Sequence, residues 1–254
     1  MTGASGKALS RLGAGETVFA LWLSLGSPQL AELAAELDAD AIVFDLQHGC
    51  WDRPGLSAAI ALAMRGATPL VRVAANRPDL IGQALDLGAG GVIVPLVDSA
   101  EEAAAAVAAA HYPPFGCRSG GGMRPLADFD GYLAASRHGT LVSVMIETRE
   151  ALRNIAAIAA VPGVDLVFIG PGDLALALAE DADMTLERAI GLVLAACDGA
   201  GKACGIFTGS AEAARERAGQ GFRFVVASDD IRLAREGLRE ALAAARATGS
   251  AVAS

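Results

Sequence analysis

The chain has 254 residues, of which 53% are hydrophobic, and its formal net charge is −9. This length is usual for a single α/β barrel, and the hydrophobic fraction supplies a large buried core. Because the acidic chain has no cluster of Lys and Arg, we expect it to bind neither nucleic acid nor an anionic membrane surface.

Short β-like runs alternate with helical segments rich in Ala, Leu, Glu and Arg along the chain. The expected strands are 18–24, 41–45, 69–73, 91–97, 141–146, 164–169, 203–207 and 222–228. The expected helices are near 28–37, 54–65, 78–87, 99–110, 149–160, 185–200, 211–219 and 230–246. Eight strands that are each followed by a helix predict one (β/α)8 TIM barrel, a single domain over 1–254. A doubly wound sheet is the alternative, but that fold seldom needs eight such units.

One connection breaks this alternation. Residues 111–140 contain the segment HYPPFGCRSGGGMRP and then a short helix-like piece at 128–137. An irregular connection of this length is uncommon inside a compact domain unless it carries function. We therefore expect a functional role for this insertion.

Polar or glycine-rich residues follow six of the expected strands. They are Asp45-Leu46-Gln47-His48, Arg72, Pro95, Glu147, the turn Gly170-Pro171-Gly172-Asp173, and Thr208-Gly209. In an α/β barrel the C-terminal ends of the strands face one mouth, where catalytic groups lie. Two carboxylates, a histidine and an arginine at such a mouth predict a metal-assisted enzyme acting on a small acidic substrate.

Glu147 and Asp173 are candidate metal ligands. Each follows a strand, and adjacent βα units bring such positions together at the mouth. Two carboxylates that leave open positions for water and substrate suit a hard divalent cation such as Mg²⁺ or Mn²⁺. Either residue alone could equally cap the helix that follows it, but both together favour the metal.

Two further elements are candidate anion-binding groups. Successive backbone amides in the turn 170–173 can bind a carboxylate or a phosphate. Arg72 interrupts an apolar strand, so it is either a buried ion-pair partner or a carboxylate clamp. We favour the clamp, because the planar guanidinium fork matches a carboxylate.

His48 is the candidate general base. It follows Asp45 in a strand-end turn, and a neighbouring carboxylate gives a histidine the orientation and pKa that a base needs. Cys50 is close in sequence but has no second base to activate it as a nucleophile. The only lysines are Lys7 and Lys202, so a Schiff-base aldolase is not expected.

The combination of these segments resembles the HpcH/HpaI aldolase family, the metal-dependent class II pyruvate aldolases that cleave 4-hydroxy-2-oxo acids. The resemblance runs through nearly the whole chain. The matching segments are Leu21-Trp22-Leu23-Ser24, Asp45-Leu46-Gln47-His48-Gly49, Val71-Arg72-Val73, Gly91-Val92-Ile93-Val94-Pro95, Tyr112-Pro113-Pro114-Phe115-Gly116-x-Arg118, Ile146-Glu147-Thr148, and Phe168-Ile169-Gly170-Pro171-Gly172-Asp173-Leu174.

The resemblance implies roles for the residues at the mouth. Glu147 and Asp173 would bind a divalent metal ion (Mg²⁺, Mn²⁺ or Co²⁺), and Arg72 would stabilise a developing enolate oxygen. His48, oriented by Asp45, would act on the 4-hydroxyl group. The remaining expected contacts are the turn of Gly170, Pro171 and Gly172 for the substrate carboxylate, Gln47 as a site-lining or supporting residue, and Trp22 and Phe207 at the aldehyde end.

The resemblance also implies an assembly of identical chains, a hexamer or a trimer, with the C-terminal helix packing on a neighbour. Asp86 would approach the site of an adjacent subunit. The substrates would be small 2-oxo acids and aldehydes from the breakdown of aromatic compounds or sugar acids.

The expected function is therefore cleavage of a 4-hydroxy-2-oxo acid to pyruvate and an aldehyde, with the reverse aldol addition. One alternative is an acyl-CoA lyase like citrate lyase β, which would need more basic residues for the nucleotide phosphates. Another is a non-catalytic barrel that binds a 2-oxo acid, for which His48 would have no use.

The cysteines and the apolar segments bear on location. Cys50, Cys117, Cys197 and Cys204 form no C-x-x-C pair and are too few for a disulfide scaffold. Reduced thiols are typical of cytoplasmic proteins, so we expect this location. No uncharged apolar run reaches the roughly 18–20 residues of a membrane-spanning helix.

Overall fold

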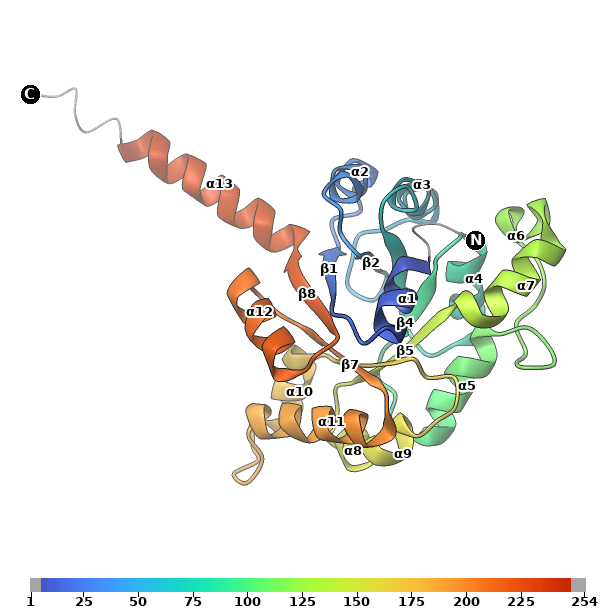
Figure 1. Ribbon diagram of the computed structural model, residues 1–254. Helices are drawn as coiled ribbons and strands as arrows, with labels where there is room; N and C mark the ends of the chain where they lie inside the picture. Colours follow the sequence, from blue (N-terminus) through green and yellow to red (C-terminus); the bar gives the residue numbers. More distant parts are fainter. Residues whose placement is uncertain (1–5, 248–254) are drawn as a thin grey trace, which may run out of the picture.

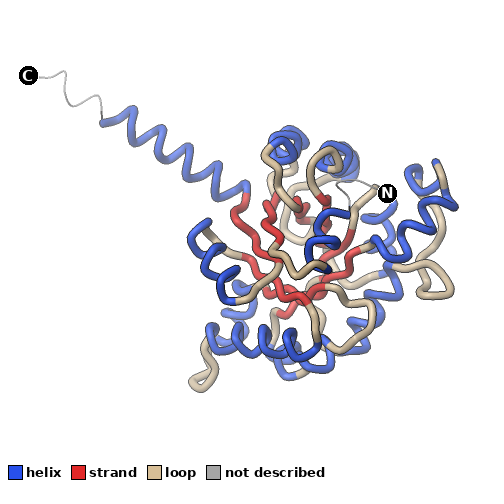
Figure 2. Tube along the Cα trace, in the orientation of Figure 1, coloured by secondary structure: helices blue, strands red, loops and turns tan. Residues whose placement is uncertain are grey.

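The computed structural model describes residues 6–247, which form a closed barrel of eight parallel strands surrounded by helices (Figures 1 and 2). The strands are β1 (Val18–Leu23), β2 (Ala41–Asp45), β3 (Thr68–Arg72), β4 (Gly91–Val94), β5 (Leu141–Ile146), β6 (Leu166–Ile169), β7 (Ala203–Phe207) and β8 (Phe224–Asp229). Each strand pairs with the next along the chain, and β8 pairs with β1. The closed barrel confirms the predicted fold and excludes the doubly wound sheet, which has open edges.

One helix precedes β1, and the other helices of residues 6–247 follow the strands on the outside of the barrel. They are α1 (Lys7–Gly13), α2 (Pro28–Glu36), α3 (Arg53–Ala63), α4 (Pro78–Asp86), α5 (Ala100–Ala110), α6 (Met123–Ala127), α7 (Phe129–Gly139), α8 (Arg149–Arg153), α9 (Ile155–Ala159), α10 (Pro171–Leu178), α11 (Leu186–Ala200), α12 (Ala211–Gln220) and α13 (Asp230–Ala247). Within residues 6–247, no helix combines the length and the apolar run that crossing a bilayer requires.

Four helical features of the described residues differ from the sequence-based expectation, and one of them is α6, which lies before the helix-like piece expected at 128–137. The helix expected at 149–160 is divided into α8 and α9 at Asn154, whose side chain donates to the carbonyl oxygen of Asp98 (2.7 Å). Helix α10 begins inside the turn 170–173, where we predicted only a turn. Helix α1 was not predicted; its buried Ala8 packs with Val18 and Ala20 of β1.

Side chains that alternate along the strands form two separate hydrophobic cores, one inside the barrel and one between the barrel and the helices. Inside the barrel lie Val43, Leu70, Met145 and Phe168, whereas Ile42, Val71, Val144 and Val167 pack outward against the helices. Because side chains alternate along a strand, the residue two positions after each inward residue also points inward, at the mouth. These next positions are Asp45, Arg72, Glu147 and Gly170, so the same repeat that packs the core aims the polar groups.

Helix α13 leaves the barrel after one turn and extends into solvent (Figures 1 and 2). Its first residue, Asp230, is buried and accepts from the backbone N–H groups of Ser24 (2.9 Å) and Leu25 (2.9 Å). Beyond this anchor Ile231, Leu238 and Leu242 are exposed apolar side chains. Most of this helix therefore has no packing partner within the described part of the chain.

Gly91 offers a test of the strand packing. A Cβ atom at this buried position of β4 would lie 2.3 Å from the carbonyl oxygen of Leu141 in β5. We expect Gly91→Ala to lower the free energy of unfolding by about 1–3 kcal/mol through overpacking. In α4, a Cβ on Gly82 meets nothing within 4 Å. Gly82→Ala should therefore raise stability by about 0.5–1 kcal/mol, and urea unfolding would contradict this account if both variants shifted in the same direction.

Candidate active site

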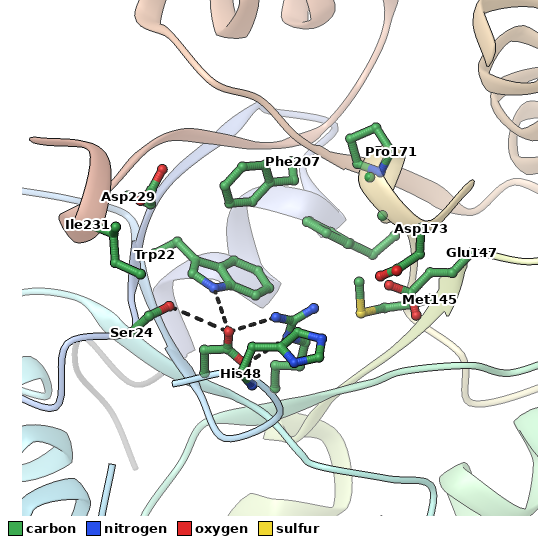
Figure 3. Close-up of a pocket in the computed structure, with 15 residues that line it drawn as sticks. Trp22, Ser24, His48, Met145, Glu147, Pro171, Asp173, Phe207, Asp229 and Ile231 are labelled. Carbon is green, nitrogen blue, oxygen red and sulfur yellow. Dashed lines mark hydrogen bonds and ion pairs between the residues drawn. The ribbon is translucent and has the colours of Figure 1, made fainter. Parts of the chain in front are cut away.

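A pocket of about 320 Å³ opens at the C-terminal ends of the strands (Figure 3). Every strand except β4, together with the loops and helices that follow, contributes to its wall. Ten of the predicted site residues line it: Trp22, Asp45, His48, Arg72, Glu147, Gly170, Pro171, Gly172, Asp173 and Phe207. Ser24, Met145, Phe168, Asp229 and Ile231 complete the lining.

Asp45 is the centre of the hydrogen-bond network on the His48 side of the pocket. Its buried carboxylate accepts two hydrogen bonds from Arg72, from Nε (2.9 Å) and Nη2 (2.6 Å). It also accepts from the indole of Trp22 and the hydroxyl of Ser24, both at 3.4 Å. Burial would raise the pKa of Asp45, but the hydrogen bonds and positive charge of Arg72 outweigh burial and lower that pKa. Asp45 is therefore held as a carboxylate.

The same carboxylate fixes the turn that carries His48. Oδ1 of Asp45 accepts from the backbone N–H of Gln47 (2.9 Å) and of His48 (3.3 Å). The imidazole of His48 is exposed and lines the pocket. We predicted that Asp45 would orient this imidazole, whereas its hydrogen bonds to residue 48 go to the main chain. Asp45 thus positions His48 through the backbone of the turn.

Arg72 combines the two roles that the sequence left open. It is the ion-pair partner of Asp45, and its guanidinium lies 4.9 Å from the ring centroid of Trp22. Both contacts restrain the planar fork at the wall of the pocket. The Nη1 group has no hydrogen-bond partner within residues 6–247, so one donor remains for a ligand.

Glu147 and Asp173 lie together on the opposite side of the pocket, with their carboxylates directed into the same space (Figure 3). Glu147 is buried, and its Oε2 accepts from the backbone N–H of Leu96 (3.1 Å). Its Oε1 is buried and has no hydrogen-bond partner within the described residues. Burial raises the pKa of Glu147, and the negative charges of Asp173 and Asp45 add to this, against the Leu96 amide and Arg72.

These two carboxylates fit a divalent cation. A buried carboxylate oxygen without a partner is costly unless a proton or a cation satisfies it. Gly170 permits the arrangement, since a Cβ there would lie 2.4 Å from Oε1 of Glu147. No group of three or more His, Cys, Asp or Glu side chains suited to a metal occurs in residues 6–247. Two carboxylates would leave the other positions of a cation to water and substrate, and the predicted metal site stays a prediction here.

The first turn of α10 borders the same space. Its N-cap residue, Gly170, makes no side-chain capping hydrogen bond, so the backbone N–H groups of the first turn have no capping side chain. Such free amides at a helix N-terminus attract a carboxylate or a phosphate. The predicted carboxylate-binding turn is therefore the start of a helix.

The far wall is apolar and contains residues that we did not predict. Trp22 stacks on Phe168 (5.8 Å between centroids) and makes an edge contact with Phe207 (5.5 Å). Met145 and Phe168 lie one inward step before Glu147 and Gly170, so the strand repeat carried a signal for them. Asp229 and Ile231 come from the junction of β8 and α13, where we predicted only a helix start.

Gln47 and Asp86 do not line the pocket. Gln47 contributes its backbone N–H to Asp45. Asp86 is the last residue of α4, at the opposite end of the barrel, and it pairs with Arg118 (2.8 Å). Its predicted approach to an adjacent subunit stays a prediction.

The insertion at 111–140 also lies away from the mouth. It joins the end of α5 to the start of β5, at the N-terminal end of the barrel, and none of its residues lines the pocket. Its buried Arg118 is held between the rings of Tyr112 (4.6 Å) and Tyr132 (5.5 Å). The expected functional role has no counterpart in this chain's own pocket.

Neither lysine reaches the pocket. The Nζ of Lys7 donates to Asp38 (2.9 Å), and the Nζ of Lys202 donates to the carbonyl oxygen of Val164 (2.8 Å). Lys202 directly precedes β7, so it lies at the end of the barrel opposite the mouth. This placement agrees with the expectation that no Schiff base forms.

The Asp45–Arg72 pair gives a stability prediction. Asp45→Asn removes the charge opposite a buried guanidinium and should lower the free energy of unfolding by about 3–5 kcal/mol at pH 7. Since the folded pKa of Asp45 is lowered, its contribution is complete above the unfolded pKa of about 3.9 and is lost as the pH falls through the folded value. The difference between wild type and variant should therefore shrink in acid.

The Arg77–Asp79 pair is a matched control for this experiment. It has the same two-bonded geometry, at 3.0 and 2.7 Å, but both side chains are exposed. Asp79→Asn should change stability by no more than about 1 kcal/mol. Equal losses for the two substitutions in urea unfolding would contradict a special role for the buried pair.

Comparison with known proteins relates the whole chain to one family. The family model "HpcH/HpaI aldolase/citrate lyase" matches residues 18–237. A hydroxypyruvate/pyruvate aldolase of Rhizorhabdus wittichii is 41% identical over 240 residues, which cover 92% of this chain and 96% of the relative. A 2-dehydro-3,6-dideoxy-6-sulfogluconate aldolase of Pseudomonas putida is 34% identical over 230 residues, covering 88% and 92% of the two chains.

A solved structure agrees with these relatives. The crystal structure of an HpcH/HpaI aldolase/citrate lyase family protein from Burkholderia cenocepacia J2315 superposes with a TM-score of 0.88 at 35% identity, covering 95% of this chain and 99% of the other. Together with the aldolase relatives, the match supports a lyase of the aldolase type. The chain belongs to the HpcH/HpaI aldolase/citrate lyase family.

Proposed function

We propose that the chain is a divalent-metal-dependent aldolase that cleaves 4-hydroxy-2-oxo acids to pyruvate, or a close 2-oxo acid, and an aldehyde. The reverse aldol addition would use the same site. The observation that carries this proposal is the unpartnered Oε1 of Glu147, buried beside Asp173 and the free amides of α10.

The charge of the pocket supports a bound cation. Within the described part of the chain, four carboxylates line it (Asp45, Glu147, Asp173 and Asp229), against one guanidinium, that of Arg72. An anionic 2-oxo acid would be repelled by this excess of negative charge. Glu147 and Asp173 would hold Mg²⁺, Mn²⁺ or Co²⁺. Such an ion, when bound, would act as a Lewis acid and stabilise negative charge on the keto oxygen.

The chain's own residues then divide the remaining work. His48 accepts the proton of the 4-hydroxyl group, directly or through one water, as that oxygen becomes the aldehyde carbonyl. The bond between carbons 3 and 4 breaks, and its electron pair passes to the 2-oxo acid fragment as an enolate. Arg72, through its free Nη1, donates to the oxygen on which this charge develops, and the amides of α10 bind the carboxylate.

The apolar wall would receive the aldehyde half. Trp22 and Phe207 line it, and Ile231 extends it toward the mouth. The two relatives are named for different substrates, one for hydroxypyruvate and pyruvate and the other for a sulfogluconate derivative.

The two alternatives fit the pocket less well. An acyl-CoA lyase needs cations for nucleotide phosphates. Among residues 6–247 only Arg72, of the Lys and Arg side chains, lines the pocket, and it is paired with Asp45. A non-catalytic binder of 2-oxo acids would not need an exposed imidazole in the pocket.

Pyruvate release is the test of this function. We expect metal-free protein supplied with Mg²⁺, Mn²⁺ or Co²⁺ to release pyruvate from 4-hydroxy-2-oxo acids, measured through coupled lactate dehydrogenase. Excess EDTA should abolish the release. Glu147→Gln removes a charged ligand and should lower kcat/KM by at least about a thousandfold, a loss of roughly 4 kcal/mol in transition-state stabilisation.

Two further variants make this experiment decisive. Glu150 is exposed, three residues from Glu147 and outside the pocket, so Glu150→Gln should retain wild-type activity. His48→Ala should abolish turnover while leaving Mn²⁺ binding unchanged. Full activity in EDTA would exclude the metal-dependent reaction, and unchanged turnover in His48→Ala would remove the base from the mechanism.

We also propose that the chain assembles with copies of itself through α13. An apolar groove of about 210 Å³ lies between α2, β1 and the root of α13, lined by Leu30, Leu33 and Leu37 among others. Leu33 and Leu37 are 57% and 74% exposed. On α13 the exposed Ile231, Leu238 and Leu242 form one stripe at helical spacing. A second copy's α13 would cover this groove and bury its own stripe.

Charge on the stripe tests the assembly. Leu238→Glu combined with Leu242→Glu should convert the assembly to a smaller species in light scattering after size-exclusion chromatography, because burying either carboxylate is unfavourable. Glu240 lies on the opposite face of α13, and Glu240→Lys should leave the mass unchanged. A wild-type monomer at tens of micromolar protein would exclude the assembly.

A further inference from the structure

We propose that Asp98 is a positioning residue that sets the direction of the free Oε1 of Glu147. This inference rests on the proposed role of Glu147 as a metal ligand. Asp98 does not line the pocket, and it would act through two loops, 95–99 after β4 and 147–148 after β5.

The first observation is the backbone of Leu96. Its φ is +54°, a left-handed conformation that only Asp38 shares among the non-glycine residues described. The side chain of Leu96 is 52% exposed, so burial of this side chain does not explain the conformation. The conformation turns the Leu96 N–H toward Glu147, where it donates to Oε2 (3.1 Å). With Oε2 occupied, Oε1 is the oxygen that remains for a cation.

The second observation is a clamp between the two loops. Oδ1 of Asp98 accepts a hydrogen bond from the hydroxyl of Thr148, the residue next to Glu147. The carbonyl oxygen of Asp98 accepts from Nδ2 of Asn154 (2.7 Å), at the break between α8 and α9. The Asp98 N–H donates to Glu102 (2.6 Å). Each of these three hydrogen bonds of Asp98 restrains the loop 95–99.

These contacts close a ring. The chain runs from Leu96 to Asp98, crosses to Thr148 through the side chains, continues to Glu147, and returns to Leu96 through the amide. A disfavoured backbone conformation persists only where the surroundings hold it. Asp98 and Thr148 are the side chains of the ring that link the loops, and neither lines the pocket. Removal of the Asp98 side chain should let Leu96 relax and the Glu147 carboxylate rotate.

The affinity for a metal ion is a direct measure of how the Glu147 carboxylate is positioned. We would measure the Kd for Mn²⁺ of the metal-free full chain by electron paramagnetic resonance. Asp98→Ala should weaken binding by about ten- to a hundredfold, the usual effect of losing a partner that supports a metal ligand. Asp98→Asn keeps an acceptor oxygen for Thr148 and should restore affinity to within about threefold of wild type. Thr148→Val should repeat the loss, and Thr148→Ser should not.

The variants distinguish positioning of Glu147 by Asp98 from an effect of the Asp98 charge and from a general loss of protein stability. If long-range charge were the cause, Asp98→Asn would weaken binding as much as Asp98→Ala does. Asp128 caps α7 at the other end of the barrel, and Asp128→Ala matches the loss of a loop aspartate without touching the ring. It should leave the Kd unchanged. Leu96→Gly added to Asp98→Ala should recover part of the affinity, because glycine adopts a positive φ without a steric penalty.

The outcomes are distinguishable. If the wild-type protein binds Mn²⁺ and the Kd is the same in Asp98→Ala and Thr148→Val, the role of Asp98 is overturned and the proposed function stands. A wild-type protein that binds no Mn²⁺ would overturn the metal site, and with it this inference.

Discussion

The site depends on one buried carboxylate with a full set of donors. Asp45 accepts from the guanidinium of Arg72, the indole of Trp22, the hydroxyl of Ser24 and the amides of Gln47 and His48. The donors come from β1 and the residue after it, from β3 and from the turn after β2, while Asp45 itself ends β2. A charge this buried is tolerated only when it is so completely paired, and the pairing makes the three strand ends a rigid unit.

Glu147 contrasts with Asp45 across the same pocket. Both carboxylates are 2% exposed, but Asp45 has its pKa lowered by Arg72 whereas burial raises the pKa of Glu147. One is satisfied by the protein and the other keeps an oxygen without a partner. We propose that this difference gives the two residues different roles, with Asp45 holding the strand ends together and Glu147 binding a ligand. A pocket that separates two acids in this way has its polarity set before any substrate arrives.

The sequence predicted the fold because eight apolar runs with turn signals between them leave few other arrangements. It also predicted most of the pocket, since Asp45, Arg72, Glu147 and Asp173 all lie where a strand ends. Contacts between elements were beyond its reach. For example, Asp45 binds the backbone N–H of His48 and not its ring, and this depends on the path of the turn that joins the two residues. Asp229 follows the expected strand 222–228 and so carried the same signal, but we interpreted it as a helix start. Ile231 was missed because the departure of α13 from the barrel is a tertiary feature.

The placement of the two lysines has a practical consequence. Lys7 lies in α1 and Lys202 directly precedes β7, so both ε-amino groups are at the end of the barrel opposite the pocket. The exposed thiol of Cys50, by contrast, lies two residues from His48. Attachment to a solid support through these amines would leave the mouth facing the solution, whereas attachment through the thiol of Cys50 would place the tether beside the imidazole.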